Sequence, residues 1–196
     1  MGTVGTGLSM SLDGFIAGPE DDVQRVFAWY FGGDADYQMP SGTMSIKISP
    51  ASADLLRRVH ESTGALVTGR RTFDLTNGWG GRHPLDVPVV VVTHSIPREW
   101  ASDGSPFTFV TDGVESAVAK AKDIAGNKNV GVGAASIVQQ CINAGLLDEI
   151  HVDLVPVLLG RGIRLFDHLG IEPITLERTR VIEAPDVTHL TFRVVR

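Results

Sequence analysis

Short hydrophobic runs and helical spacings alternate along this chain. Five apolar runs predict strands, at 4–10, 65–68, 88–93, 107–110 and 150–155. The run at 88–93 contains four consecutive valines, which is typical of a strand covered on both faces of a sheet. Between these runs, apolar residues that share one helical face predict amphipathic helices. The chain therefore combines buried strands with surface helices.

The predicted helices carry recognisable start and stop residues. Ser49 is an N-cap and Pro50 the first helical position of one helix, which Gly64 ends. Asp112 and Glu115 resemble a capping box at the start of a helix over 113–125. The last two strands, 174–182 and 187–195, flank the turn 184–186 and predict an antiparallel hairpin at the edge of the sheet.

Residues 19–48 do not follow this strand and helix pattern. Acidic residues at 20–22 suit the first turn of a short helix with an apolar face of Val23, Val26, Phe27 and Tyr30. A loop is predicted from Gly32 to Gly42, with Tyr37 and Met39 as anchors. Two roles fit this insertion: a lid over a substrate pocket, or packing against the core or a partner subunit.

The segment 129–166 carries the clearest binding motif. Val130 and Val132 lie on a strand, Gly131 and Gly133 allow a tight turn, and a helix opens with Ala134, Ala135 and Ser136. Free N–H groups at such a helix N-terminus bind phosphate well. Gln139 falls on the polar face of this helix and Cys141 on the apolar face.

Three interpretations of this glycine turn stay open on the residues alone. It matches the dinucleotide fingerprint G-x-G-x-x-G only in part, because Ser136 replaces the third glycine and Asp153 lies within a strand. It also suits a pyrophosphate in another kind of α/β sheet. The third interpretation is an ordinary strand-to-helix turn without a ligand.

Two further clusters follow strand ends, where ligands gather in open α/β sheets. Gly69, Arg70, Arg71 and Thr72 follow the strand at 65–68, and an NADP 2′-phosphate needs such cationic forks and hydroxyls. Thr93, His94 and Ser95 follow the strand at 88–93. A histidine there suits a phosphate or an adenine, or it caps a turn.

Composition limits the classes of partner. The 196 residues are 43% hydrophobic and 20% charged, as in ordinary globular proteins, and the formal net charge of −6 argues against a nucleic-acid partner. The lone Cys141 cannot form an internal disulfide, so a cytoplasmic location is expected. No signal peptide, membrane-spanning run or metal-ligand spacing is recognisable, so neither a membrane nor a metal is expected.

The motifs taken together resemble a known family. They are S-M-S-L-D-G-F-I-A at 9–17, T-G-R-R-T-F at 68–73, V-V-V-V-T-H-S at 89–95, and the segment from Gly133 to Val152 followed by P-V-L-L-G-R-G. This combination is similar to the reductase domain of the bacterial riboflavin-biosynthesis deaminase-reductase and to the dihydrofolate reductase superfamily. The resemblance implies one α/β domain over 1–196, with three layers, a mostly parallel central sheet flanked by helices, a C-terminal antiparallel hairpin, and NADPH as cofactor.

The resemblance also implies roles for individual residues. Asp13 and Gly14 match the S-L-D-G loop, which in the family lies over the reactive face of the nicotinamide, and Arg70 and Thr72 match the G-R-x-T motif that touches the cofactor. Met10, Gly14 and Trp79 are expected to contact substrate. Met10 and Gly14 belong to the first motif, whereas Trp79 is the single aromatic residue of the flexible loop 78–81, which is expected near the mouth of the pocket.

Three carboxylates are candidates for catalysis. Asp13 follows the first strand, Asp54 lies early in the helix that begins at Pro50, and Asp153 lies on one strand face with His151 and Val155. Proton donation suits Asp153 because its strand is expected to be central and buried. The alternatives are a turn cap for Asp13, an exposed helix acid for Asp54 and a structural hydrogen-bond acceptor for Asp153.

The resulting hypothesis is an NADPH-dependent reductase of a pterin-like or ribosylaminopyrimidine-like substrate. The alternative is a non-catalytic nucleotide-binding or regulatory protein that retains the fold. A homodimer is expected, because family members commonly pair and because apolar residues alternate along the hairpin at Val187, Leu190, Phe192 and Val194.

Overall fold

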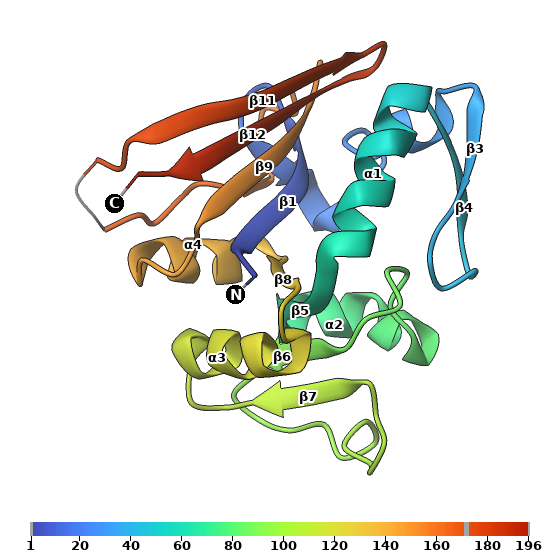
Figure 1. Ribbon diagram of the computed structural model, residues 1–196. Helices are drawn as coiled ribbons and strands as arrows, with labels where there is room; N and C mark the ends of the chain where they lie inside the picture. Colours follow the sequence, from blue (N-terminus) through green and yellow to red (C-terminus); the bar gives the residue numbers. More distant parts are fainter. Residues whose placement is uncertain (1, 171–172, 196) are drawn as a thin grey trace.

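The computed structural model describes residues 2–170 and 173–195 and contains an eight-stranded sheet with helices on both faces (Figure 1). Across the sheet the strands are β11 (Leu176–Ala184), β12 (Val187–Val194), β9 (Glu149–Val155), β1 (Val4–Ser11), β8 (Asn129–Val132), β5 (Thr63–Gly69), β6 (Val89–Val92) and β7 (Phe107–Val110). The helices are α1 (Pro50–Ser62), α2 (Arg70–Leu75), α3 (Val114–Ala125) and α4 (Ala135–Asn143).

Six neighbouring strands, from β9 to β7, are parallel, and β12 and β11 add an antiparallel hairpin beside β9. Parallel strands need long crossover connections, and α3, α4 and the segment that contains α1 supply them. The predicted fold class, a mostly parallel sheet with a C-terminal hairpin between helical layers, is confirmed.

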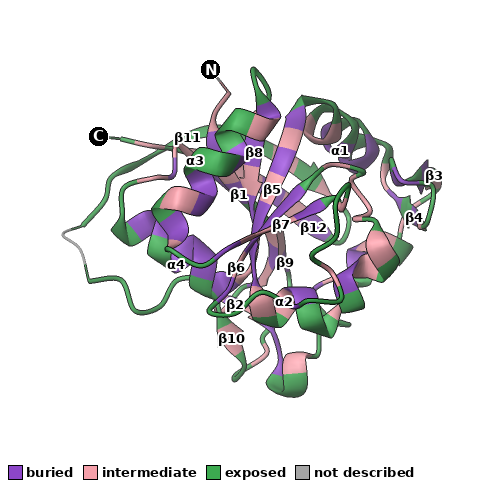
Figure 2. Ribbon diagram, turned by 90° about the horizontal axis from the view of Figure 1, so that it is seen from below, coloured by how far each residue is buried: buried purple, intermediate pink, exposed green. Residues whose placement is uncertain are grey.

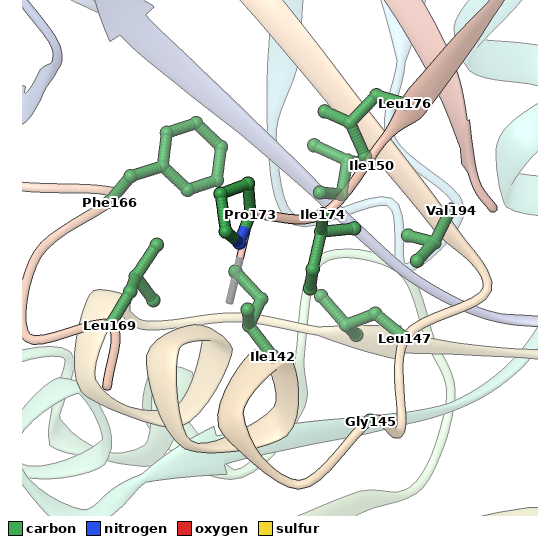
Figure 3. Close-up of a pocket in the computed structure, with 10 residues that line it drawn as sticks. All are labelled: Ile142, Gly145, Leu147, Ile150, Phe166, Leu169, Pro173, Ile174, Leu176 and Val194. Carbon is green, nitrogen blue, oxygen red and sulfur yellow. The ribbon is translucent and has the colours of Figure 1, made fainter. Parts of the chain in front are cut away.

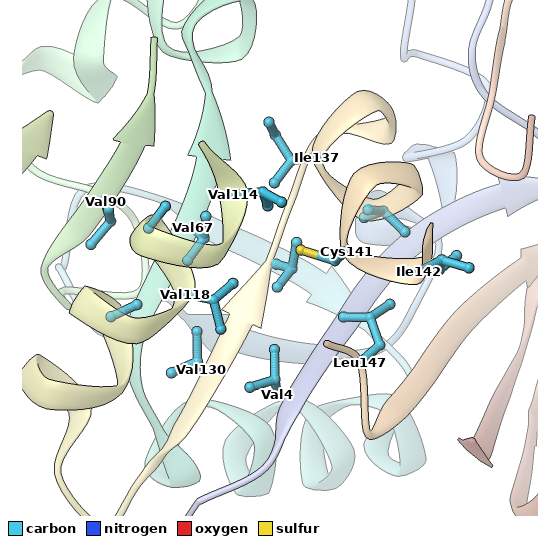
Figure 4. Packing of buried hydrophobic residues seen from close by; sticks show 14 of the residues in the cluster. Val4, Val67, Val90, Val114, Val118, Val130, Ile137, Cys141, Ile142 and Leu147 are labelled. Atoms are coloured by element: carbon cyan, nitrogen blue, oxygen red, sulfur yellow. The ribbon is translucent and has the colours of Figure 1, made fainter. Parts of the chain in front are cut away.

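The larger core lies between the sheet and the helices α3 and α4 (Figure 4). Val67, Val90 and Val130 of the strands meet Val118 of α3 and Cys141 of α4 there, each 2% exposed or less. Burial raises the pKa of the Cys141 thiol to about 12, so this thiol is a core group as predicted. Figure 2 shows the same concentration of buried residues along the central strands.

Alternate residues of the same strands face the opposite layer. Val89 and Val91 pack with Phe73 of α2 and Phe107 of β7, whereas Val90 between them faces α3 and α4. Val89, Val90 and Val91 are therefore each buried on one face or the other, and Val92 is partly buried. No helix within 2–170 and 173–195 combines the length and the apolar composition that a membrane span requires.

The insertion 19–48 differs from its prediction. In place of one helix and a loop, it forms two 3-10 helices, η1 (Pro19–Asp21) and η2 (Ala28–Phe31), and a hairpin of β3 (Ala35–Gln38) and β4 (Ser45–Ile48). Trp29, Tyr37 and Ile48 pack with α1 and with Val155 of β9. These contacts with residues distant in the sequence determine the structure of the insertion, and they make it part of a second core.

Three local predictions also need correction. Helix α3 begins after Gly113, whose φ of 107° only glycine adopts readily, and no side chain caps it. Helix α1 ends at Ser62, since Thr63 and Gly64 already belong to β5. Gln139 is buried, and its side-chain amide donates to the carbonyls of Arg164 and Leu165 at 3.1 Å.

The loop after β1 and the loop after β9 are joined by a small ladder. β2 (Phe15–Ala17) pairs with β10 (Ile163–Arg164) in an antiparallel arrangement. Gly162 has a φ of 140°, and a Cβ atom at this position would overlap the carbonyl of Ala17. This close approach explains the second glycine of the G-R-G sequence. A third 3-10 segment, η3 (Asn77–Gly81), carries Trp79.

If the insertion is part of the core, truncating Ile48 will destabilise the whole protein. Ile48 is 0% exposed, so Ile48→Ala removes buried methyl groups and leaves a cavity. We expect the free energy of unfolding in urea to fall by about 2–5 kcal/mol. Lys47→Ala, at the exposed neighbour on the same strand, is the control and is expected to change it by less than about 0.5 kcal/mol. Equal, small effects of the two substitutions would show that the hairpin is only an appended lid.

Candidate functional site

The carboxyl ends of three parallel strands bring the predicted nucleotide motifs together. Gly69 of β5 pairs with Val92 of β6, and Val67 of β5 pairs with Val132 of β8. The residues that follow, at 70, 93 and 133, therefore emerge at one edge of the sheet. A Cβ atom added to Gly69 would lie 3.2 Å from Ile137 and 3.8 Å from the hydroxyl of Ser136, so the two motifs touch.

Helix α4 presents its N-terminus at this edge. Ala134 is the N-cap with φ 70° and ψ 130°, a strained conformation for a residue with a side chain. The first helical hydrogen bonds run from the N–H groups of Ile137 and Val138 to the carbonyl of Ala134. The N–H groups of Ala135 and Ser136 precede these bonds, as in an anion-binding helix terminus.

Arg70 lies across the ends of β5 and β6. Its Nε donates to both carboxylate oxygens of Asp74, at 2.7 and 2.9 Å, and its Nη1 donates to the carbonyl of Ser95 at 2.9 Å. The hydroxyl of Thr93 donates to the same carbonyl at 2.8 Å. Within the described part of the chain, Nη2 of Arg70 has no hydrogen-bond acceptor. Asp74 and the carbonyl of Ser95 thus hold the guanidinium in place, and the N–H groups of Nη2 are still available to a ligand.

The other residues predicted to bind the cofactor do not all point to this edge. Arg71 turns away and pairs with Asp21 of η1 at 2.6 Å, which raises the pKa of its guanidinium. Thr72 is part of α2, and His94 is exposed beyond β6. Gly131 lies within β8, not in the turn, and a side chain there would overlap Leu66. Packing alone explains that glycine.

Asp13 binds two loops together. It accepts hydrogen bonds from the hydroxyl of Ser11 at 2.6 Å, the N–H of Leu159 at 3.1 Å and the N–H of Gly160 at 2.7 Å. These donors, the Ser11 hydroxyl first among them, lower the pKa of the carboxyl to about 2. An ionised, fully engaged carboxylate cannot donate a proton at neutral pH, so the structure favours a structural role for Asp13.

Asp54 and the predicted substrate contacts add little to a site. Asp54 is 62% exposed on α1 and pairs with Arg57 at 2.7 Å. Met10 packs partly against the α3 and α4 core, and Trp79 belongs to the aromatic group around Phe73. Gly14 has a φ of 91° and accepts a hydrogen bond from the N–H of Leu165.

Asp153 lies in a buried polar chain. Its Oδ1 is 2.6 Å from Nδ1 of His189, the residue directly opposite on β12. Nε2 of His189 is 2.8 Å from the hydroxyl of Ser52 on α1. The side chain of Asp153 is 20% exposed and that of His189 only 3%. His189 thus holds the carboxyl through Oδ1, while part of the Asp153 side chain remains exposed to solvent.

Residues of the insertion cover this chain. The ring of Trp29 packs edge-on against His189 at 5.2 Å, and its Nε1 donates to the hydroxyl of Ser9, the partner of Asp153 on β1. Burial and the nearby Asp153 carboxylate raise the pKa of Tyr30. The 3-10 helix η2 therefore seals the histidine from solvent.

Sequence reasoning missed His189, Ser52 and Trp29. One signal was present for the histidine: it alternates with Leu190 and Phe192, so it had to lie on the same sheet face as Asp153 once the strands paired. Ser52 gave no signal beyond its place in the first turn of α1. Trp29 was hidden in the insertion whose helix was wrongly predicted.

A family model matches nearly the whole chain. The RibD C-terminal domain model covers residues 3–190. Among curated proteins, the uncharacterized protein YyaP of Bacillus subtilis (strain 168) is 26% identical over 170 residues, which are 81% of this chain and 77% of that protein.

Solved structures share the fold. A crystal structure from Shewanella sp. PV-4, whose name proposes a riboflavin biosynthesis protein, has a TM-score of 0.77 at 18% identity and covers 99% of both chains. The bifunctional deaminase and 5-amino-6-(5-phosphoribosylamino)uracil reductase of Thermotoga maritima gives 0.62 at 15% identity over 99% of this chain, which spans 57% of that one. Dihydrofolate reductase of Enterococcus faecalis, in complex with NADP(H), gives 0.56 at 15% identity over 98% of this chain and 96% of its own.

The Asp13 contacts predict a specific acid sensitivity. Because folding lowers the pKa of this carboxyl to about 2 from its ordinary value of 3.8, its contribution to stability is present above about pH 4 and is lost as the pH falls towards 2. We expect Asp13→Asn to melt at a lower temperature than wild type near pH 6, with the difference shrinking between pH 4 and pH 2. Thermal unfolding at successive pH values measures it. A constant difference across this range would contradict the assignment.

Proposed function

The chain belongs to the RibD C-terminal domain family, and on that basis we propose that it is an NADPH-dependent reductase that transfers a hydride to a small pterin-like or ribosylaminopyrimidine-like heterocycle. The solved relatives of reductase type support the reaction class. The observation that carries the proposal is the position of Arg70, which directly follows Gly69 where that residue approaches Ser136 at the N-terminus of α4.

This edge offers two subsites for one dinucleotide. The N–H groups of Ala135 and Ser136 suit a pyrophosphate, because the helix terminus combines free donors with a positive dipole end. Arg70, with the Thr93 hydroxyl next to it, suits the 2′-phosphate that distinguishes NADPH from NADH. The residues present therefore fit NADPH, which when bound supplies a hydride for the reduction.

Asp153 is the carboxyl best placed to serve the substrate. Of the three candidates, Asp13 is saturated by loop donors and Asp54 points into solvent, whereas Asp153 is half enclosed beside Ser9 in the centre of the sheet. Reduction of a C=N bond adds a hydride to carbon and a proton to nitrogen. We assign the proton to Asp153.

A nucleotide-binding protein without chemistry remains the second candidate. The pairing of Arg70 with Asp74 supports it, since a ligand phosphate has to share the guanidinium with that carboxylate. Turnover separates the two: oxidation of NADPH that depends on a pterin or an aminopyrimidine excludes the binding protein, and tight NADPH binding without turnover across such a panel favours it.

Arg70→Ala tests the nucleotide subsite. A charge-assisted contact to the 2′-phosphate contributes about 1.5–3 kcal/mol, which corresponds to about ten- to a hundredfold in affinity. We expect the substitution to weaken NADPH by that factor and to leave NADH nearly unchanged, measured by nucleotide fluorescence titration. Arg71→Ala is the matched control and is expected to leave NADPH affinity unchanged within about twofold, because Arg71 faces Asp21.

Other outcomes of this titration have clear meanings. Equal losses for NADPH and NADH would show that Arg70 only supports the fold through Asp74. No binding of either nucleotide by the wild-type protein would remove the proposed function.

We also propose a homodimer, with a different surface from the one expected. Leu190, Phe192 and Val194 of β12 pack against the larger core, and β11 covers the outer edge of β12. A continuous apolar surface surrounds a cavity of about 280 Å³ between α4 and β11 (Figure 3). Four of its side chains are between 36% and 40% exposed: Phe166, Leu169, Ile174 and Leu176. Such a patch is typical of a protein interface.

Leu176→Glu places a carboxylate in the wall of this cavity. We expect light scattering at micromolar concentration to report a dimer for wild type and a 21.0 kDa monomer for the variant, with NADPH affinity retained. Val23→Glu, at an exposed apolar residue outside the cavity, is expected to remain dimeric. A monomeric wild-type protein would contradict the proposal.

A further inference from the structure

The hydrogen bonds behind Asp153 form a chain that has a direction. Ser49, the N-cap of α1, accepts from the backbone N–H of Ser52 at 3.1 Å, and its hydroxyl donates to the hydroxyl oxygen of Ser52 at 2.9 Å. A hydroxyl carries one hydrogen, and the Ser52 hydroxyl already accepts from Ser49. Its own hydrogen is therefore free to point to Nε2 of His189, 2.8 Å away.

This direction selects a tautomer of His189. A neutral imidazole carries one N–H, and the nitrogen that accepts from Ser52 cannot also donate. When the Ser52 hydrogen points to Nε2, Nε2 is the acceptor, and the N–H is then on Nδ1, where it donates to Oδ1 of Asp153 at 2.6 Å. Every donor from Ser49 to His189 then points towards Asp153.

The two oxygens of Asp153 consequently differ. Oδ1 accepts from His189, whereas Oδ2 has no hydrogen-bond partner in residues 2–170 and 173–195. A proton that the carboxyl binds is favoured on Oδ2, because one lone pair of Oδ1 already accepts from the ring and Oδ2 accepts from no described residue. The side chain of Asp153 is 20% exposed, so the carboxyl is not closed off from a substrate or, between turnovers, from solvent.

The surroundings keep the chain in this arrangement. His189 is 3% exposed and Ser52 is 1% exposed, and Trp29 closes the ring face. The groups that ionise nearby are Asp153 itself, the Tyr30 phenol and, beside Ser49, the exposed Asp186. Ser49 and Ser52 border a cavity of about 20 Å³, large enough for one water molecule.

We propose that Ser49, Ser52 and His189 are positioning residues that fix the transferable proton of Asp153 on Oδ2. The role rests on the proposed function, in which the O–H bond of Asp153 breaks as the proton joins the substrate nitrogen. NADPH, when bound, would supply the hydride that the adjacent carbon gains. Asp153 is left as a carboxylate, still held by Nδ1–H of His189, and Oδ2 regains its proton from solvent. His189 keeps its own proton throughout.

Two substitutions of Ser49 test the direction of these hydrogen bonds. One of them preserves the direction and the other reverses it. Ser49→Asn keeps an N-cap oxygen and replaces the hydroxyl donor with an amide N–H, so the direction is kept. Ser49→Asp is almost the same shape and caps equally well, but at neutral pH it only accepts. The Ser52 hydroxyl then turns to residue 49 and accepts from Nε2 of His189, which has to carry a proton. Ala51→Asp, at an exposed neighbour, controls for the added charge.

The first measurement needs no substrate. Nitrogen chemical shifts of histidine side chains in the full chain report which ring nitrogen is protonated, and His189→Gln identifies the signals of residue 189. We expect Nδ1–H with a bare Nε2 in wild type, Ser49→Asn and Ala51→Asp, and a proton on Nε2 in Ser49→Asp. A proton on Nε2 in the wild-type protein near pH 7, or identical signals for the Ser49 pair, would overturn the assignment.

The second measurement is the rate of NADPH oxidation with whichever pterin or aminopyrimidine the wild-type protein accepts. Ser49→Asp is expected to lower kcat by about tenfold or more while KM and nucleotide affinity stay within about twofold, and Ser49→Asn is expected to keep the wild-type rate. Equal rates for the pair would rule out a positioning role in catalysis. If wild type oxidises no NADPH with any substrate, the proposed function fails, and the chemical shifts alone decide whether the chain fixes the tautomer.

Discussion

The parallel register of β5, β6 and β8 is the constraint on which the candidate site depends. The pairs Gly69 with Val92 and Val67 with Val132 set the level at which three loops leave the sheet. A shift of one residue in either pair would turn the valines that face α3 and α4 towards the other layer, so the hydrophobic core fixes the register. The position of the candidate anion-binding edge is thus a consequence of valine packing several residues away from it.

The three carboxylates show how surroundings divide one chemical group among different tasks. Asp13 meets three donors and joins two loops, Asp54 meets one arginine in solvent, and Asp153 meets a single buried donor and keeps one oxygen open. The number and direction of the donors distinguish them. Sequence position alone made all three of them candidates.

The strands, α1 and the order of the motifs could be predicted from the sequence because each depends on local pattern. The valine run of β6 and the Ser49-Pro50 start of α1 are examples. The β3 and β4 hairpin could not be predicted, because Tyr37 and Ile48 are stabilised by α1 and β9, which lie far away in the sequence. Arg70 and Asp74 were not expected to pair because α2, at six residues, gives too little periodicity to recognise a helix. The contact between Asp153 and His189 depends on a strand register across 36 positions.

The position of Cys141 gives the protein a built-in reporter. It is the one cysteine of the sequence, it is 0% exposed in the larger core, and its thiol ionises only near pH 12. A thiol reagent reacts with the thiolate and needs contact with the sulfur, so the folded molecule is protected twice. Modification can proceed only through openings that separate α4 from the sheet. The alkylation rate of the unmodified protein therefore measures how often α4 separates from the sheet, and the measurement requires no label or substitution.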